Sequence, residues 1–264
     1  MDQLIFLGTG GARMVMSSQV LSTGGFILEM DDTLLSIDPG PGAIVHATRE
    51  KLKLQELKGI LLSHRHLDHC GDVNVMIEAM TRGGYDRSGV VFAPGQALYE
   101  DPVVLKYLWK YVGAVKQLEE RKSYSCGRLE FKTSLAHRHG DAETYGFLFH
   151  GSKGVLGYLP DTRYFPELAS FYKCDILIVS NLLLHKGKVD HLCASEVAQL
   201  LKEISPAAAI LTHFGMSMWK AGVDTIADKI AQKAGVRVIA AKDGMRLELS
   251  ELMKQRINGG EIDA

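Results

Sequence analysis

Three histidines and one aspartate gather in a single short segment, residues 63–71, which reads SHRHLDHCG. An apolar run over 59–62 comes before it and predicts a buried strand, and the spacing over 71–82 predicts a helix. Alternate residues of an extended chain point the same way, so one such loop can serve two metals. Imidazole is the commonest metal ligand, and zinc accepts nitrogen and oxygen donors together. We therefore interpret the segment as a metal-binding loop rather than a solvated histidine-rich one. Its candidate ligands are His64, His66, Asp68 and His69.

The composition is that of an ordinary globular protein and excludes several classes. The 264 residues are 46% hydrophobic and 23% charged, and 30 basic against 31 acidic side chains leave a net charge of −1. No overall positive field exists to hold nucleic acid, which leaves only a local basic patch for that role, and no apolar run reaches the roughly 18 residues of a membrane span. The N-terminus lacks the basic flank of a secretory signal, and the four cysteines form no Cys-x-x-Cys pair. These features predict a cytoplasmic protein without a disulfide framework.

Strands and helices alternate along the chain in two strand-rich halves. The expected strands are 4–7, 26–30, 33–37, 59–62, 90–92, 129–136, 145–150, 154–159, 175–180, 207–212, 236–240 and 245–249. The expected helices are 43–52, 71–82, 102–112, 194–203 and 217–233, whereas residues 12–18 lack a convincing helical pattern. Asp101 followed by Pro102 is a typical helix start, and the apolar segment behind it either packs in the core or covers the site. The pattern predicts one α/β domain over 1–264, a four-layer sandwich with a helical insert at about 83–125.

The ligand loop resembles the His-x-His-x-Asp-His signature of the metallo-β-lactamase superfamily, and the resemblance extends over nearly the whole chain. It implies an αββα sandwich with a metal site at the rim where the two sheets end. His139 precedes a Tyr-Gly-Phe strand and is similar to the family's third histidine, although His137 is a competing choice. Asp161 and His213 each follow a predicted strand and match the bridging aspartate and the last ligand. Asp38 resembles an aspartate that steadies the ligand loop, but a turn-forming Asp before Pro is an equal alternative.

By this resemblance, one cation takes His64, His66 and His139, and the other takes Asp68, His69 and His213. Asp161 lies between them and both keep an open position, where two cations can supply a bridging hydroxide as nucleophile. Zinc is the expected metal, and Mn or Fe also suits these donors. Oxygen reductases of the superfamily carry Glu at the position of His66, so imidazole there favours hydrolysis over redox chemistry.

His191 is the last catalytic candidate, since its segment resembles the nuclease and phosphodiesterase branch of the family. A histidine there protonates the leaving group or braces the transition state, and Glu196 could orient its ring; a helix-capping or surface histidine is the alternative. We also predict that Asp68 is a catalytic residue in addition to being a metal ligand. His185 is a weaker rival to His191.

Four hypotheses for the function follow. The leading one is a metal-dependent phosphodiesterase acting on a small phosphodiester. The second is a tRNA 3′-processing endonuclease with an RNA substrate, although residues 83–125 do not resemble the Gly/Pro-rich arm of that enzyme. A thioester or lactam hydrolase and a non-catalytic metal-binding protein are the others. The sequence does not distinguish a monomer from a homodimer.

Overall fold

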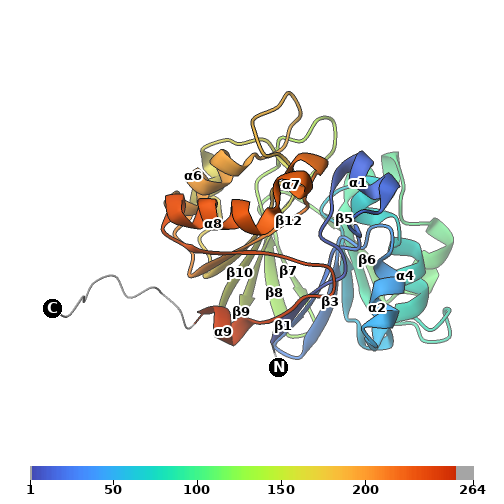
Figure 1. Cartoon of the computed structure of the whole chain (residues 1–264). Coiled ribbons are helices and arrows are strands. Elements are labelled where there is room, and N and C mark those ends of the chain that lie inside the picture. The colour runs from blue at the N-terminus through green and yellow to red at the C-terminus, as the bar shows by residue number, and fades with distance from the viewer. Residues whose placement is uncertain (1, 254–264) are drawn as a thin grey trace.

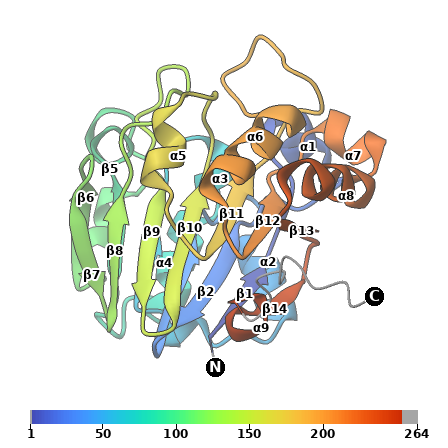
Figure 2. The same cartoon turned by 90° about the vertical axis from the view of Figure 1, so that its left-hand side faces the viewer.

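The computed structural model describes residues 2–253, which form two β-sheets face to face between two layers of helices (Figure 1). Turned by 90°, the molecule shows the strands of the second sheet running side by side under α5, α6 and α8 (Figure 2). The αββα sandwich expected from the sequence is therefore confirmed.

The first sheet is built from the N-terminal half and one late strand. Its spatial order is β14-β1-β2-β3-β4-β5-β6, and β3 to β6 run parallel to one another. The hairpin between β2 and β3 turns at Asp31 and Asp32, both with positive φ, as a two-residue type I′ turn requires. The strands are β1 (Gln3–Phe6), β2 (Phe26–Met30), β3 (Thr33–Ile37), β4 (Gly59–Leu61), β5 (Val90–Pro94), β6 (Ala114–Leu118) and β14 (Arg246–Glu248).

The second sheet is built from the C-terminal half in the order β13-β12-β11-β10-β9-β8-β7. Strands β10 to β13 are parallel, and their carboxyl ends therefore lie at one edge of the sheet. The strands are β7 (Ser123–Cys126), β8 (Leu129–Thr133), β9 (Phe147–Gly151), β10 (Gly154–Leu159), β11 (Ile176–Ser180), β12 (Ala208–Thr212) and β13 (Arg237–Ala240).

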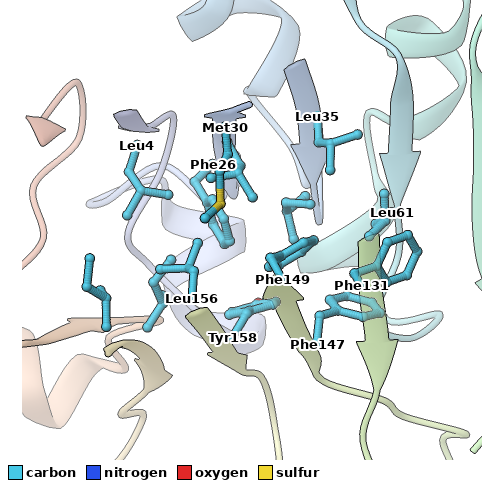
Figure 3. Close-up of a cluster of buried hydrophobic side chains, with 14 of the residues drawn as sticks. Leu4, Phe26, Met30, Leu35, Leu61, Phe131, Phe147, Phe149, Leu156 and Tyr158 are labelled. Carbon is cyan, nitrogen blue, oxygen red and sulfur yellow. The ribbon is translucent and has the colours of Figure 1, made fainter. Parts of the chain in front are cut away.

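Alternation along each strand divides the apolar residues between two layers. In β1, Leu4 and Phe6 face the other sheet, while Ile5 faces the helices. Aromatic side chains from both sheets fill the space between them, as Figure 3 shows for Phe26 and Phe131. Because both faces of the central strands are buried, these strands are apolar almost throughout.

Helices cover the outer face of each sheet. α2 and α4 cover the first sheet, and α5, α6 and α8 cover the second (Figures 1 and 2). The α-helices are α1 (Ala12–Ser18), α2 (Ala43–Arg49), α3 (Leu67–Cys70), α4 (Val73–Met80), α5 (Glu167–Phe171), α6 (Ala194–Ile204), α7 (Met216–Ala221), α8 (Val223–Ala234) and α9 (Leu249–Met253). The shorter helical turns are η1 (Leu54–Glu56), η2 (Gln96–Glu100) and η3 (Lys106–Lys110). Along residues 2–253, no helix has the length and apolar character needed to cross a membrane.

The predicted helix over 102–112 was wrong. Its first residues are not helical, and only η3 forms within it. The Asn74 side chain bonds to the carbonyl of Val103 and to the N–H of Leu105, at 2.9 Å each, and so replaces helical hydrogen bonds. The Asp101 carboxylate, expected as a cap, lies 3.1 Å from Nε of Arg65. Tertiary partners therefore decide this segment against its local helix signal.

Other predicted elements differ in their limits. Residues 12–18 do form a helix, which begins where the Ala12 N–H donates to the Asp68 carboxylate over 2.6 Å. The predicted helix 217–233 is broken into α7 and α8 at Gly222, whose φ is +83°. The segment expected as a helical insert contributes β5, β6 and β7 to the two sheets.

Candidate metal centre

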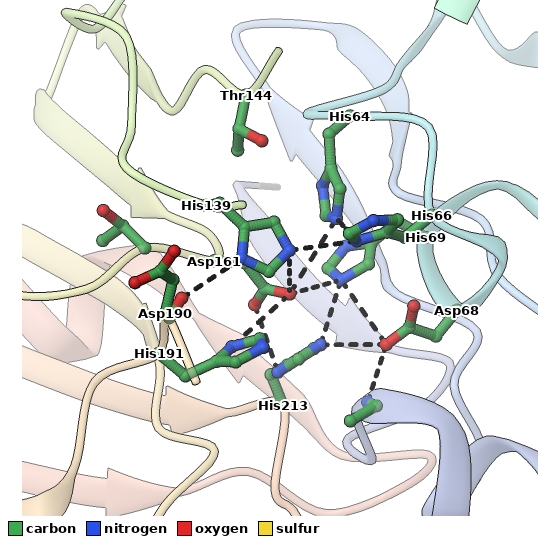
Figure 4. Close-up of polar contacts among 12 residues, drawn as sticks. His64, His66, Asp68, His69, His139, Thr144, Asp161, Asp190, His191 and His213 are labelled. Carbon is green, nitrogen blue, oxygen red and sulfur yellow. Dashed lines mark hydrogen bonds and ion pairs between the residues drawn. The ribbon is translucent and has the colours of Figure 1, made fainter. Parts of the chain in front are cut away.

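The candidate residues come from loops at the rim where parallel strands end. The 64–69 loop follows β4, Asp161 follows β10 and His213 follows β12, while His139 stands in the loop before β9. His191 lies between β11 and α6. Figure 4 shows these side chains, all predicted from the sequence, pointing toward one another. The structure thus brings together residues that are up to 149 positions apart, from His64 to His213.

One group consists of three imidazoles. Nε2 of His64 and Nε2 of His139 each lie 3.0 Å from Nδ1 of His66. The donor atoms all lie within 4.8 Å of one another, as a shared cation requires. This is the trio that the sequence analysis assigned to one cation.

The second group combines a carboxylate with two imidazoles. Nε2 of His213 lies 2.9 Å from Nε2 of His69 and 3.2 Å from Oδ2 of Asp68. These donors, together with Asp161, again lie within 4.8 Å of one another. His213 has a φ of +59°, a conformation that is uncommon for a residue with a side chain.

Asp161 lies between the two groups. Its Oδ2 is 3.3 Å from Nε2 of His69 and 3.6 Å from Nε2 of His139, and its Oδ1 is 3.2 Å from Nδ1 of His213. The side chain is only 2% exposed. Oδ2 therefore approaches a histidine of each group, which is the position expected of a bridging ligand.

The outer nitrogen of several imidazoles meets an oxygen. Nδ1 of His64 lies 2.9 Å from Oγ of Ser63, Nδ1 of His69 lies 2.9 Å from Oδ2 of Asp38, and Nδ1 of His139 lies 3.1 Å from the carbonyl of Asp190. Such partners hold the proton on Nδ1 and leave the Nε2 lone pair directed into the cluster. Ser63 and Asp190 were not predicted from the sequence, because neither position has more than an ordinary polar signal.

Asp38 stabilises the ligand loop through its side chain. Of the two interpretations of Asp38, this supports a role in holding the loop rather than a role limited to forming a turn before Pro39. Besides the His69 contact, its carboxylate accepts hydrogen bonds from the N–H and O–H of Ser63, at 2.6 Å each, and from the hydroxyl of Tyr158 at 2.8 Å. Asp38 is 1% exposed, so these donors compensate the loss of water around its charge.

The electrostatics of the centre are those of buried, mutually dependent groups. Burial lowers the pKa of His64 well below its usual value, and the neighbouring His69 lowers it further. Burial also opposes charge on His69, but Asp161, Asp68 and Asp38 raise its pKa well above the usual value. Burial would raise the pKa of Asp161, yet His213, His191 and His69 hold it well below its usual range. The Asp161 carboxylate is therefore ionised and favours positive charge in the site.

The donor set fits divalent cations. Oδ1 of Asp161 and Nδ1 of His213 are buried and make no hydrogen bond among the described residues. Nδ1 of His66 lies within hydrogen-bond distance of Nε2 of both His64 and His139. It could accept hydrogen bonds from both only if each of those nitrogens carried a proton. Unsatisfied buried nitrogen and carboxylate atoms in such a cluster are what a zinc-type cation would coordinate.

His191 borders the cluster but makes a different kind of contact. Its ring stands 4.7 Å from that of His139, centroid to centroid, and its Nδ1 is 3.7 Å from Oδ2 of Asp161. Burial lowers its pKa to about 4. The expectation that Glu196 orients this ring was wrong, because Glu196 accepts a hydrogen bond from the N–H of Cys193 and pairs with Lys186, capping α6.

An open groove lies beside the centre, next to the His139 loop. It has a volume of about 540 Å³. Tyr99 lines it and is half exposed, whereas Val104 and Leu108 are buried under the first sheet's helical layer. Val104, Leu108 and Val112 of the 102–112 segment therefore pack in the core, whereas Leu105 and Tyr107 are exposed. One wall of the groove comes from η2, just before this segment. The groove is lined by Gly95, Gln96, Tyr99, Glu100, Gln117, Gly140, Asp141, Ala142 and Glu143.

Comparisons with known proteins agree with the fold. A family model described as a beta-lactamase superfamily domain matches residues 33–214. An uncharacterized protein of Methanocaldococcus jannaschii is 30% identical over 256 residues, 94% of this chain and 95% of that protein. Among solved structures, a diphosphatase of the PhnP family aligns with a TM-score of 0.69 at 21% identity, over 94% of this chain and 97% of its own. The short form of human tRNase Z aligns with a TM-score of 0.67 at 17% identity, over 94% and 99%. Because the family model matches well over half of the chain, the chain belongs to the beta-lactamase superfamily.

Proposed function

We propose that this protein is a metal-dependent phosphodiesterase acting on a small phosphodiester. The observation that carries the proposal is the convergence of seven nitrogen- and oxygen-bearing residues on two adjoining groups, with His191 standing at their edge. The residues that would hold cations are His64, His66, Asp68, His69, His139, Asp161 and His213. A pair of divalent cations in such a site makes an ionised water available near neutral pH and neutralises charge on phosphoryl oxygens.

His191 supplies the proton that the departing alkoxide needs. Its side chain is 12% exposed, so the ring borders both the cluster and solvent. A phosphodiester carries a negative charge, which favours the protonated ring and offsets the effect of burial. Donation from this ring to the leaving-group oxygen contributes about 10²–10⁴-fold to the rate.

Asp68 acts from the opposite side of the cluster. The Ala12 N–H and Nε2 of His213 both approach its Oδ2, at 2.6 and 3.2 Å, which fixes the orientation of the carboxylate. As an acceptor, Asp68 can orient the proton of an attacking water as well as serve as a ligand.

The test uses protein loaded with Zn²⁺ or Mn²⁺ and assayed with bis(p-nitrophenyl) phosphate and small cyclic phosphodiesters, beside a β-lactam and a thioester. We expect turnover of the phosphodiesters. Hydrolysis of the lactam or thioester by fully loaded protein that leaves every phosphodiester intact would refute the proposal.

A tRNA 3′-processing endonuclease is the second candidate, favoured by the structural similarity to human tRNase Z. The net charge of −1 argues against it, because RNA binding depends largely on phosphate contacts. Cleavage of precursor tRNA at two salt concentrations separates the candidates: an RNA enzyme cuts at the 3′ end and loses binding steeply as salt rises, and a small-molecule enzyme does neither.

A further inference from the structure

His137 is a buried histidine that the proposed reaction does not use. The sequence offered it as an alternative to His139, two residues away, but the structure directs its ring elsewhere. It is 6% exposed, with Nδ1 3.2 Å from the carbonyl oxygen of Asp161 and Nε2 2.9 Å from the hydroxyl of Tyr172. Across residues 2–253, His137 belongs to no group of side chains that could hold a metal.

The partners of His137 define where its proton lies. A carbonyl oxygen can only accept a hydrogen bond, so Nδ1 carries a proton and donates a hydrogen bond to the backbone carbonyl of Asp161. Nε2 of this neutral ring is then an acceptor, and the hydroxyl of the fully buried Tyr172 donates to it. Every polar atom of the ring is thereby satisfied in one tautomer and one orientation.

The ring lies where two ligand-bearing segments meet. The N–H of Arg138 donates to Oγ1 of Thr162 at 3.1 Å, and the N–H of Arg163 donates to the carbonyl of Arg138 at 3.0 Å. These bonds hold residues 137–139 beside residues 161–163. One segment carries His139 and the other carries Asp161. The hydrogen bond from His137 to the Asp161 carbonyl joins the two segments at Asp161, which is itself a member of the cluster.

We propose that His137 is a positioning residue, which fixes Asp161 and His139 relative to each other through its bond to the Asp161 carbonyl and its support from Tyr172. The inference rests on the proposed function only in taking these two residues as ligands. It concerns how tightly the centre binds cations, not which substrate is cleaved. Loss of groups that orient ligands in this way costs about 10–100-fold in metal affinity.

The alternative is that the His137 ring merely fills space. Replacing it with phenylalanine would then reduce stability but leave metal affinity unchanged. His137→Asn separates the two cases, because its amide nitrogen can replace Nδ1 as donor to the carbonyl while filling less space. Phe149→Leu is the matched control: Phe149 is fully buried between the sheets, away from the rim, and the change reduces packing alone.

The experiment measures Zn²⁺ affinity by competition with a chelator, and the stability of metal-free protein by denaturant unfolding. We expect His137→Phe to bind Zn²⁺ about 10–100-fold more weakly than wild type. His137→Asn keeps the donor to the Asp161 carbonyl and Tyr172→Phe keeps the whole ring, so each should bind Zn²⁺ more weakly than wild type but more tightly than His137→Phe. Phe149→Leu should lose stability without losing affinity. Affinity within twofold of wild type in His137→Phe, or a His137→Asn variant as weak as His137→Phe, would overturn the proposal.

Two readouts keep the test independent of folding and of turnover. If His137→Phe does not fold, Tyr172→Phe removes one hydroxyl and tests the same connection. NMR of the ¹⁵N-labelled wild-type imidazoles should show His137 neutral with its proton on Nδ1, and a proton on Nε2 would overturn the inference. Zinc-loaded wild type that cleaves no phosphodiester would end the proposed function, while the affinity results would still decide the role of His137.

Discussion

Asp38→Asn is the substitution that tests the support of the ligand loop most directly. The Asp38 carboxylate accepts from Ser63 N–H and O–H, from Tyr158 O–H and from His69 Nδ1. An amide of the same shape has a single acceptor oxygen, and its NH₂ group would face donors. The substitution therefore leaves at least one buried donor without a partner and removes the charge that holds the Nδ1 proton on His69.

The size of the effect follows from these contacts. Hydrogen bonds to a charged group contribute about 1.5–3 kcal/mol, and removing one member of a buried charged pair costs about 3–5 kcal/mol. We expect metal-free Asp38→Asn to lose about 3–5 kcal/mol of unfolding free energy. Zinc affinity should fall about 10–100-fold, which corresponds to about 1.4–2.8 kcal/mol.

The pH dependence of the metal-free proteins gives a further check. The pKa of His69 is raised well above its usual value in the folded state, with Asp38 among the causes. A group whose pKa is raised on folding contributes its full stabilisation at pH values below its unfolded-state pKa, near 6.5. That stabilisation is lost as the pH rises through the folded-state pKa. The stability difference between wild type and Asp38→Asn should therefore be largest at low pH and narrow toward alkaline pH.

Urea unfolding in the presence of a chelator and competitive zinc titration provide the measurements. Asp32→Asn is the matched control, since Asp32 lies in the β2–β3 turn with a 78% exposed side chain and pairs with Arg128. It should change stability by less than about 0.5 kcal/mol. An Asp38→Asn protein with the stability and zinc affinity of the Asp32→Asn control would refute the reasoning.

Three further predictions concern catalysis, the core and the thiols. His191→Ala should lower kcat about 10²–10⁴-fold while elemental analysis finds the metal content unchanged, and unaltered kcat would remove its role. Phe131→Ala should cost about 3–5 kcal/mol in denaturant unfolding, because this ring is 1% exposed and packs between the sheets; a loss below 1 kcal/mol would contradict that packing. Burial raises the pKa of Cys126 from its usual 9.0 to about 11 and that of Cys174 to about 12. Since the thiolate is the nucleophile, iodoacetamide at pH 8 should label these cysteines at least about 100-fold more slowly in native than in unfolded protein, as mass spectrometry would show; equal rates would contradict the burial.

The sequence by itself determined the fold class and the candidate centre. Alternating and continuous apolar runs identified most strands, because burial on one or both faces of a sheet imposes a pattern that is local in the chain. The 64–69 loop was also readable, since its donors are adjacent in sequence. His139, Asp161 and His213 were recognised by resemblance. Asp161 and His213 follow the parallel strands β10 and β12, whose carboxyl ends lie at one rim, while His139 stands in the loop before β9.

Tertiary structure alone decided what depends on partners distant in the chain. Asn74 and Arg65 override the helix signal at 101–112, and the contact of Ala12 with Asp68 accompanies a helix that has no clear local signal. The sequence also left the roles of Asp38 and His137 undecided, because their partners are distant in the chain. The buried hydrogen bond of Asp38 is to His69, 31 positions away, and that of His137 is to Asp161, 24 positions away. Local patterns report which face of the chain is buried, whereas the partner of a polar group is set only when the two sheets and their loops come together.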